Sequence, residues 1–419
     1  MKIFLFTNFT PTRDNFRGPS AMMYHFIKNR SKECEFLVYT TNSNLVPINQ
    51  VKSVSKELGT NIYILKDTIY NFFHRREKLQ ELRIKLHIDK WYNISNYRLS
   101  SKHLNCIKDF NPDIVWVYGE AHTEVIKQLS KYRLLVAGYD CFSLHYNRLM
   151  KDSYCFLNKE YYKEALFNYK IAISREIALK DISCKYFDVG IADRNMFETI
   201  TGRKDAQFYP HPHFDVFPKE INFNKQKLSI LITGKLDQYT WSDAQIMLNA
   251  LCNESQILKD KFTITILGKD WEKYERTLKD VGYNVCLKNW VDMYADEIKL
   301  HDIQLFPISV GSGTKGKVLA ALSMGLLCVG SKIAMENIFI KDRHSCYIYD
   351  CALEIPSILI DIYNDKCRSA QIAEQGRKQV LKWHNPQRIL SIICDDVMGK
   401  KSYNGINEYN EVIKNCILG

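Results

Sequence analysis

Residues 307–325 read PISVGSGTKGKVLAALSMG and are followed by the apolar run 326–329. This pattern predicts the end of a strand, a glycine-rich turn, a helix and then another strand. Small residues let a ligand approach the backbone closely, and the N–H groups at the start of a helix attract anions. Lysine and hydroxyl side chains in the same stretch add polar contacts. The stretch therefore predicts a binding site for a phosphorylated ligand within an α/β fold.

Two other interpretations of this stretch are open. Gly311–Lys317 fits the start of the P-loop pattern, but Val318 stands where that pattern needs Ser or Thr to hold magnesium. The stretch also lies late in the chain, and no nearby strand is followed by an evident acidic metal ligand. A glycine-rich turn that binds nothing is the second alternative, because such turns are common. We favour the anion site over both.

The length and composition of the chain indicate a two-domain globular protein. Its 419 residues exceed one ordinary core, and 46% of them are hydrophobic and 25% charged. No apolar run approaches the roughly 18 residues of a membrane-spanning helix. The thirteen cysteines lack any C-x-x-C pair, which argues against a disulfide framework or a zinc site. We expect reduced cysteines and a cytoplasmic location.

Positive charge is concentrated in the first half of the chain. The net charge is +11, of which residues 1–215 carry +9 and residues 216–419 carry +2. Between Lys66 and Lys108, basic residues accompany apolar ones such as Phe72 and Leu82, and such a helix can lie on anionic lipid. A solvated helix face is the alternative. Nucleic acid is not an expected partner, since no binding motif accompanies the charge.

Both halves alternate short apolar runs with segments of helical periodicity. This alternation predicts an α/β fold with two Rossmann-like domains, each a parallel sheet covered on both faces, that face each other across a cleft. In the first half the expected strands include Lys2–Thr7, Ile114–Tyr118, Leu134–Gly138 and Val189–Ala192. The expected boundaries are 1–217 for the first domain, 218–227 for a linker, 228–395 for the second domain, and 396–419 for a C-terminal helix that returns to the first.

Candidate functional residues of the first domain follow its strands, where ligands of parallel sheets collect. The loop after the first strand leads to Gly18, which lets the backbone approach a ligand. His122 and Asp140 follow two later strands, and an imidazole and a carboxylate there could transfer protons or hold sugar hydroxyls. A plain loop at Gly18 and a helix cap at Asp140 are the simpler alternatives.

In the second domain, Lys235 follows the strand predicted at 228–233 and should share a sheet edge with Lys315 and Lys317. Several lysines around one diphosphate would offset the charge of a leaving group without a metal ion. No D-x-D sequence occurs in the chain, which argues against a nucleotide diphosphate held through a metal. We therefore expect no metal site.

These residues, taken in order, resemble nucleotide-sugar-dependent glycosyltransferases of the two-Rossmann-domain (GT-B) fold, particularly the family-four group. The resemblance is carried by Gly311–Leu319, by Met324-Gly325 and by Glu336 after the next strand. Upstream, residues 267–269, 289–292 and 301–307 also fit the order of the family. The order of predicted strands and helices matches the family over the whole chain, but the amino-acid sequence matches it specifically only in residues 228–340.

The resemblance implies roles for these residues. The second domain would bind the donor, a nucleotide diphosphate-sugar that is a substrate rather than a cofactor, and the first domain would bind a glycan or lipid-linked acceptor. Expected donor diphosphate contacts are Lys235, Ser312, Gly313, Thr314 and Lys315, and the loop after the first strand adds Gly18 to them. Trp290, Val291 and Glu336 would lie near the base or the sugar, and Asp140 or His122 near the reacting bond.

The family also implies a retaining, metal-independent hexosyltransferase of cell-surface polysaccharide synthesis, active in the cytoplasm at the inner face of the membrane. The sequence departs from the family at two points. The two positions of its paired-glutamate motif are Ser312 and Ala320, and Thr240-Trp241 stand where a second lysine is common. An inactive nucleotide-sugar-binding scaffold or sensor, or a sugar-nucleotide epimerase on the same fold, are therefore alternatives.

Overall fold

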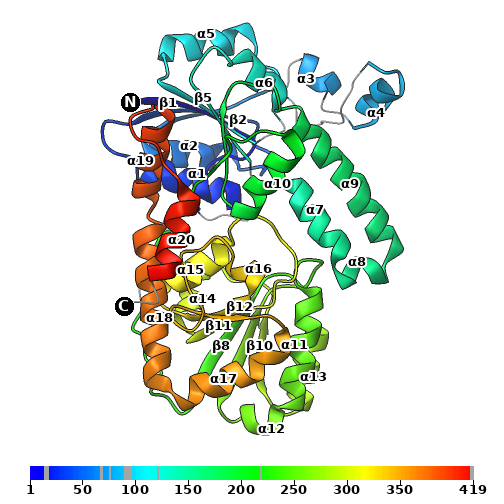
Figure 1. The fold of residues 1–419 in the computed structure, drawn as a ribbon, viewed down its shortest axis with the longest axis vertical. Coiled ribbons are helices and arrows are strands. Elements are labelled where there is room, and N and C mark those ends of the chain that lie inside the picture. Colours follow the sequence, from blue (N-terminus) through cyan, green and yellow to red (C-terminus); the bar gives the residue numbers. More distant parts are fainter. Residues whose placement is uncertain are drawn as a thin grey trace. The chain divides into compact units, whose positions relative to one another are not determined.

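The computed structural model describes residues 1–13, 18–66, 69–74, 77–88, 97–119, 122–138, 140–217 and 219–415. The chain divides into two compact units, each built around one parallel sheet (Figure 1). The first unit comprises Met1–Tyr146, Glu164–Pro212 and Pro386–Ile406. The second comprises Asn147–Lys163, His213–Asn385 and Asn407–Gly419.

These boundaries differ from the expected ones in the first half of the chain and at the linker. Residues 147–163 interrupt the first half but belong to the second unit. The expected linker 218–227 contributes Phe223, 3% exposed, to the core of the second unit. Helical periodicity shows that a segment has an apolar face, but it does not show which sheet that face will cover.

The C-terminal part of the chain also differs from the expectation. Residues 386–406 belong to the first unit, because Ile389 and Ile393 of α19 (Pro386–Val397) are buried in its core. The chain then returns to the second unit with α20 (Gly405–Asn415), where the ring of Tyr409 packs edge-on against Phe339.

The first unit holds a seven-stranded sheet in the order β3-β2-β1-β4-β5-β6-β7, with every pair parallel. Side chains alternate across it: Ile3 and Leu5 of β1 enter one core, and Phe4 and Phe6 enter the other. The strands are β1 (Lys2–Thr7), β2 (Glu35–Thr40), β3 (Asn61–Ile64), β4 (Ile114–Tyr118), β5 (Leu134–Ala137), β6 (Lys185–Asp188) and β7 (Gln207–Phe208).

One predicted strand of this sheet is wrong. Val189–Ala192 was expected to be extended, but the strand is Lys185–Asp188 and the helix α10 begins at Ile191. Tyr186 and Phe187 supply the buried strand residues and pair with β5. The apolar run therefore covers the turn from strand to helix, where Gly190 is the N-cap.

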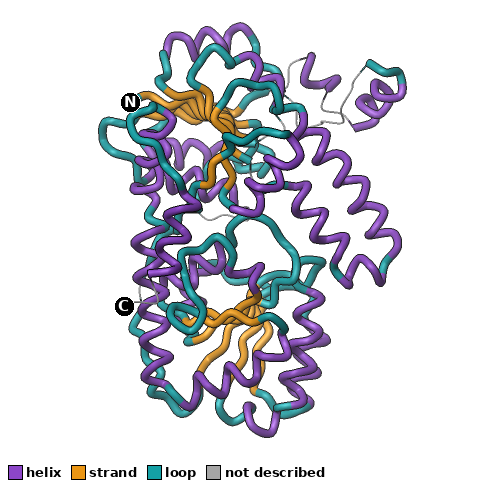
Figure 2. The backbone as a smooth tube through the Cα atoms, in the orientation of Figure 1, coloured by secondary structure: helices purple, strands orange, loops and turns teal. Residues whose placement is uncertain are grey.

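Helices cover both faces of the first sheet, and Figure 2 shows the strands enclosed by them. The helices of this unit are α1 (Gly18–Lys28), α2 (Ile48–Leu58), α3 (Ile69–His74), α4 (Glu77–Lys85), α5 (Ser101–Phe110), α6 (Thr123–Gln128), the first part of α7 (Phe142–Lys151), most of α9 (Lys159–Ile177), α10 (Ile191–Thr201) and α19, of which α3 and α4 lie to one side of the sheet in Figure 1. The short helix α8 (Ser153–Leu157) lies within the segment that joins the second unit.

The second unit repeats this topology with six parallel strands in the order β10-β9-β8-β11-β12-β13. The expectation of two Rossmann-like α/β domains is thereby confirmed. The strands are β8 (Leu228–Thr233), β9 (Phe262–Leu267), β10 (Asn284–Lys288), β11 (Ile303–Phe306), β12 (Leu327–Ser331) and β13 (Tyr347–Tyr349). The last of them had not been predicted.

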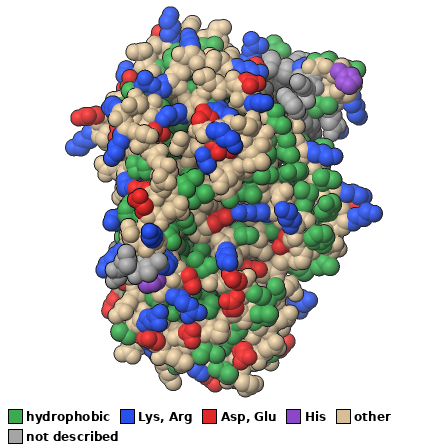
Figure 3. All heavy atoms as spheres, in the orientation of Figure 1, with side chains coloured by type: hydrophobic (Ala, Val, Ile, Leu, Met, Phe, Trp, Pro, Cys, Tyr) green, Lys and Arg blue, Asp and Glu red, His purple; other side chains and the backbone are tan. Residues whose placement is uncertain are grey.

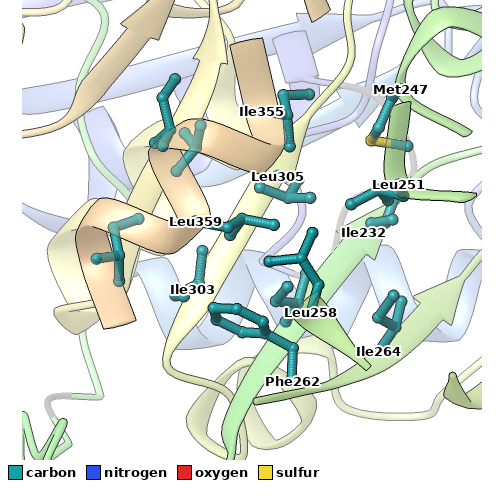
Figure 4. Packing of buried hydrophobic residues seen from close by; sticks show 14 of the residues in the cluster. Ile232, Met247, Leu251, Leu258, Phe262, Ile264, Ile303, Leu305, Ile355 and Leu359 are labelled. Atoms are coloured by element: carbon teal, nitrogen blue, oxygen red, sulfur yellow. The ribbon is translucent and has the colours of Figure 1, made fainter. Parts of the chain in front are cut away.

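Helices cover this second sheet as well, and Figure 4 shows part of one core, where α17 and α11 meet β8, β9 and β11. The helices are α11 (Trp241–Asn253), α12 (Ser255–Leu258), α13 (Glu272–Asp280), α14 (Tyr294–Lys299), α15 (Gly316–Met324), α16 (Lys332–Met335), η1 (Ala352–Glu354), α17 (Ile355–Asn364), α18 (Lys366–Trp383) and α20.

Some hydrophobic side chains remain on the surface, and Figure 3 shows them gathered over the α7–α9 region. Phe156 and Leu157 at the end of α8 are 72% and 75% exposed. None of the helices in the described ranges combines the length and apolarity that crossing a bilayer requires.

Close packing of α18 against α15 generates a stability prediction. A Cβ atom at Gly376 would collide with the carbonyl oxygen of Ser345 and lie 2.8 Å from Cδ2 of Leu322. We expect Gly376→Ala to lower the free energy of unfolding by about 1–3 kcal/mol, as overpacking does, measured by denaturant titration. Gln371→Ala on the exposed face of the same helix is the control, and equal stabilities of the two variants would contradict this packing.

Burial of His211 generates a pH prediction. Desolvation lowers the pKa of His211 to about 4, and its Nδ1 lies 2.7 Å from the carbonyl oxygen of Pro212. The unfolded chain therefore binds a proton near pH 6.5 that the folded chain does not bind until about pH 4. Stability should fall as the pH drops through this window, by on the order of 2–3 kcal/mol from this group.

The measurement is denaturant unfolding between pH 4 and 7 for the wild type and His211→Gln. The variant should lose part of the pH dependence, whereas His344→Gln, at an exposed position, should keep it. Identical pH profiles for wild type and His211→Gln would show that His211 is not the group responsible.

Candidate functional site

The glycine-rich loop lies between β11 and α15, as the sequence predicted. Gly313 has a φ of +60°, a conformation that favours glycine, and Lys315 is the N-cap of α15. The helix is anchored by buried residues from Val318 to Met324. The loop therefore presents the start of a rigid helix at the carboxyl end of the sheet, where backbone N–H groups favour anions.

Lys315 turns back onto its own loop. Its Nζ donates to the carbonyl oxygens of Ser312 and Gly313, both at 3.1 Å, and to Oε1 of Glu336 at 2.8 Å. These three acceptors match the three N–H donors of an ammonium group. The side chain is only 12% exposed. In this structure the charge of Lys315 is thus offset by Glu336, and its expected contact with a diphosphate stays a prediction.

Glu336 is held by a second cation. Nη1 and Nη2 of Arg148 donate to Oε1 and Oε2 of Glu336 at 2.7 and 2.9 Å, a bidentate pair. Nη1 of Arg148 also donates to the carbonyl oxygen of Gly311 at 2.7 Å. Sequence reasoning missed Arg148, because no local motif marks it and its partner lies 188 positions away.

A different lysine reaches the end of β8. A Cβ atom added at Gly234 would lie 3.2 Å from Nζ of Lys317, and Lys235 follows Gly234 directly. Nζ of Lys235 lies 3.4 Å from Oδ2 of Asp270, and both of these side chains are 59% exposed. The structure therefore brings Lys235 and Lys317 to the same strand end.

Asp237 lies within the field of these two lysines. Burial raises the pKa of Asp237, and the positive charges of Lys235 and Lys317 oppose that rise. Neighbouring protein atoms lower the pKa of Lys317 by desolvating its ammonium group, while Asp237 opposes the change. Both observations indicate a compact group of charges beside the glycine-rich loop.

Trp290 and Val291 follow β10. Trp290 is 60% exposed, and Val291 packs against the core cluster that includes residues of α15. The exposed indole has the flat apolar face that a nucleobase can stack on. Their expected position near a base stays a prediction.

In the first unit, His122 and Asp140 follow the adjacent parallel strands β4 and β5. His122 is fully buried at the N-cap of α6, and its ring packs edge-on against Phe6 with centroids 4.7 Å apart. Asp140 is half-buried just before α7. Gly18 is the first residue of α1. The catalytic and binding roles expected for these three residues stay predictions.

Sequence reasoning missed a buried acidic cluster beside Asp140. The backbone N–H of Cys141 donates to Asp193 at 2.9 Å, and that of Ser143 donates to Glu176 at 3.1 Å. Burial, and then the charges of Glu176, Asp188 and Asp193, raise the pKa of the Cys141 thiol well above its usual range. The thiol is thus protonated at neutral pH, and Cys141 is not an activated nucleophile.

Within the described ranges, no three or more His, Cys, Asp or Glu side chains form a group that could hold a metal ion.

The second unit matches a known family. Residues 227–364 match the family model described as group 1 glycosyl transferases. This range contains β8 to β13, the glycine-rich loop, and Lys235 and Lys317, whose side chains lie near the end of β8. No curated protein sequence matches the chain.

Solved structures of glycosyltransferases share the fold of the whole chain. Anabaena HepE in complex with UDP is 12% identical, with 95% of this chain and 100% of that chain covered and a TM-score of 0.62. Sucrose-phosphate synthase from Thermosynechococcus elongatus is 9% identical, with 94% and 98% covered and a TM-score of 0.64. A mutant of S. aureus TarM is 10% identical, with 95% and 99% covered and a TM-score of 0.57.

The chain therefore has the two-domain α/β fold of GT-B glycosyltransferases. The resemblance to family-four-like members of that fold, expected from the glycine-rich loop, is confirmed by the family match over the second unit.

Proposed function

We propose that this protein transfers a sugar from a nucleotide diphosphate-sugar to a glycan or lipid-linked acceptor. The observation that carries the proposal is the convergence of Lys235 and Lys317 beside Gly234, next to the N-terminal end of α15. This arrangement supplies cations and helix N–H groups to one anion, and it lies within the range that matches group 1 glycosyl transferases.

In this proposal the second unit binds the donor. The diphosphate sits against Ser312, Gly313 and Thr314, and Lys235 and Lys317 offset the charge that develops on the leaving nucleotide diphosphate. The reaction is metal-independent and retaining, and hexoses are the transferred sugars. HepE, which has this fold, binds UDP and UDP-glucose, which supports a donor of this class.

The first unit binds the acceptor in the proposal. The ends of β4 and β5 place His122 and Asp140 at one edge of its sheet, where they would orient or deprotonate an acceptor hydroxyl. Polysaccharide assembly at the cell surface is the proposed pathway.

A first prediction concerns Lys317. Lys317→Ala should weaken the binding of UDP or GDP by about tenfold, because one charge-assisted contact to phosphate is lost. Isothermal titration calorimetry with UDP, GDP and ADP measures this effect. Lys273→Ala, on the exposed face of α13, is the matched control and should bind like the wild type. Absence of binding by the wild-type protein to all three nucleotides and their sugars would contradict the proposed function.

The two missing glutamates favour a second candidate, an inactive protein that binds the nucleotide sugar as a sensor or scaffold. Ala320 is 9% exposed within α15 and offers no carboxylate, and the nearby Glu336 is bonded to Lys315 and Arg148. Release of nucleotide from a panel of donor sugars, with and without acceptor glycans, separates the candidates. Binding without release favours the scaffold, and a changed sugar without acceptor favours an epimerase.

We further propose that α3 and α4 contact an anionic membrane, where lipid-linked acceptors lie. Ile69, Phe72 and Leu82 of these helices, and Leu86 and Ile88 just after α4, are 44–80% exposed. Lys78 and Lys85 are exposed beside them. Exposed apolar side chains with neighbouring lysines have the chemistry of an interfacial helix.

This proposal predicts binding to vesicles that contain phosphatidylglycerol, but not to pure phosphatidylcholine, and weaker binding as salt rises. Cosedimentation measures it. Leu82→Glu together with Leu86→Glu should abolish binding, while Leu353→Glu, at an exposed site of the second unit, should leave it unchanged. Equal binding to both vesicle types would contradict an anionic membrane contact.

A further inference from the structure

Arg148 belongs to a segment that joins the second unit from the middle of the first half of the chain. Residues 147–163 are fixed to the start of α11, where the Ser242 hydroxyl donates to Oδ1 of Asp152 at 2.6 Å. The rings of Tyr154 and Trp241 also pack with centroids 5.6 Å apart. The backbone next to Arg148 is thereby tied to the unit that carries the glycine-rich loop.

The Arg148 side chain is largely enclosed and well paired. It is 21% exposed and Glu336 is 16% exposed, so the bidentate pair is only partly screened by solvent. The planar guanidinium makes both parallel bonds to the carboxylate and still reaches the carbonyl oxygen of Gly311. A lysine at this position could not make the same fork, because an ammonium is a point charge.

Cations and an amide together hold three consecutive carbonyls of the loop. Arg148 binds that of Gly311, Lys315 binds those of Ser312 and Gly313, and Nδ2 of Asn337 also donates to that of Gly313 at 3.0 Å. In a trans peptide the C=O and the following N–H point in opposite directions. The next three N–H groups, of residues 312–314, are therefore directed away from these side chains.

Successive N–H groups turned to one side form an anion-binding concavity. The loop carbonyls would repel a phosphate, so a phosphate site needs them held on the far side. Glu336 allows Arg148 and Lys315 to lie close together and hold these carbonyls. Its carboxylate offsets one of their two positive charges, so the cluster of three side chains has a net charge of +1.

We propose that Arg148 is a positioning residue of the diphosphate site. Through Glu336 and the carbonyl of Gly311, it fixes the peptide planes of the glycine-rich loop so that the N–H groups of residues 312–314 face the phosphate. Arg148 itself does not touch the ligand. This inference rests on the proposed donor site, and it adds a residue that lies outside the range matching the family.

The test compares Arg148→Ala and Arg148→Lys with the wild-type protein. UDP and GDP affinities by calorimetry should fall about tenfold in Arg148→Ala, since charged hydrogen bonds are lost. They should recover only in part in Arg148→Lys. Added ethylguanidinium should restore binding to Arg148→Ala, an effect that general destabilisation would not show. Arg276→Ala, on the exposed face of α13, is the control and should behave as wild type.

A double-variant cycle tests the route through Glu336. Because Arg148 and Glu336 act as one pair, Glu336→Gln should weaken binding much less in Arg148→Ala than in the wild type. Unchanged affinity in Arg148→Ala, fully additive effects, or no rescue by ethylguanidinium would each overturn the inference.

Hydrogen exchange separates this inference from the proposed function. Backbone amides of residues 311–316 should exchange faster in Arg148→Ala than in wild type without any ligand, as followed by mass spectrometry. If the wild type binds no nucleotide, the donor site fails, and faster exchange still supports the bracing role of Arg148. Unchanged exchange would overturn that role whatever the protein binds.

Discussion

The ion pair between Glu336 and its two cations is the interaction on which the candidate site depends. Glu336 lies at the end of α16, and its carboxylate joins Lys315 of the glycine-rich loop to Arg148 of a distant segment. Removal of either cation would leave the partly buried carboxylate with an uncompensated charge and with unsatisfied hydrogen-bond acceptors. The loop, the start of α15 and the end of α16 are thereby constrained together, which is the rigidity that a pre-organised anion site needs.

The donor site that we propose lacks the paired glutamates common in the family. Ser312 and Ala320 offer no carboxylate, and the carboxylate of Glu336, next to the loop, is bonded to Lys315 and Arg148. Lys235 and Lys317 remain beside the end of β8. Glu336 thus bonds the two cations that contact the loop carbonyls, and Asp237 interacts with the two lysines near the end of β8.

The sequence was sufficient for most of the fold, because strands buried on both faces need continuous apolar runs such as 2–7 and 303–306. It was insufficient at Val189–Ala192, where an apolar run crosses a turn, and for residues 147–163, whose helical pattern does not reveal which sheet they join. For the site, the spacing of Lys315 and Lys317 shows two lysines at a helix start. The spacing alone does not show where each side chain points: Lys315 and Lys317 are two positions apart, and such residues point in nearly opposite directions on a helix.

The crossing of residues 147–163 into the second unit has a consequence for how this protein can be divided. A fragment that begins at His213 would contain Lys235 and Lys317 but would lack Arg148, which bonds Glu336 and the carbonyl oxygen of Gly311. Exchange of first halves between homologues would likewise replace Arg148. A chimera designed to keep the donor site that we propose therefore needs residues 147–163 together with the C-terminal sheet.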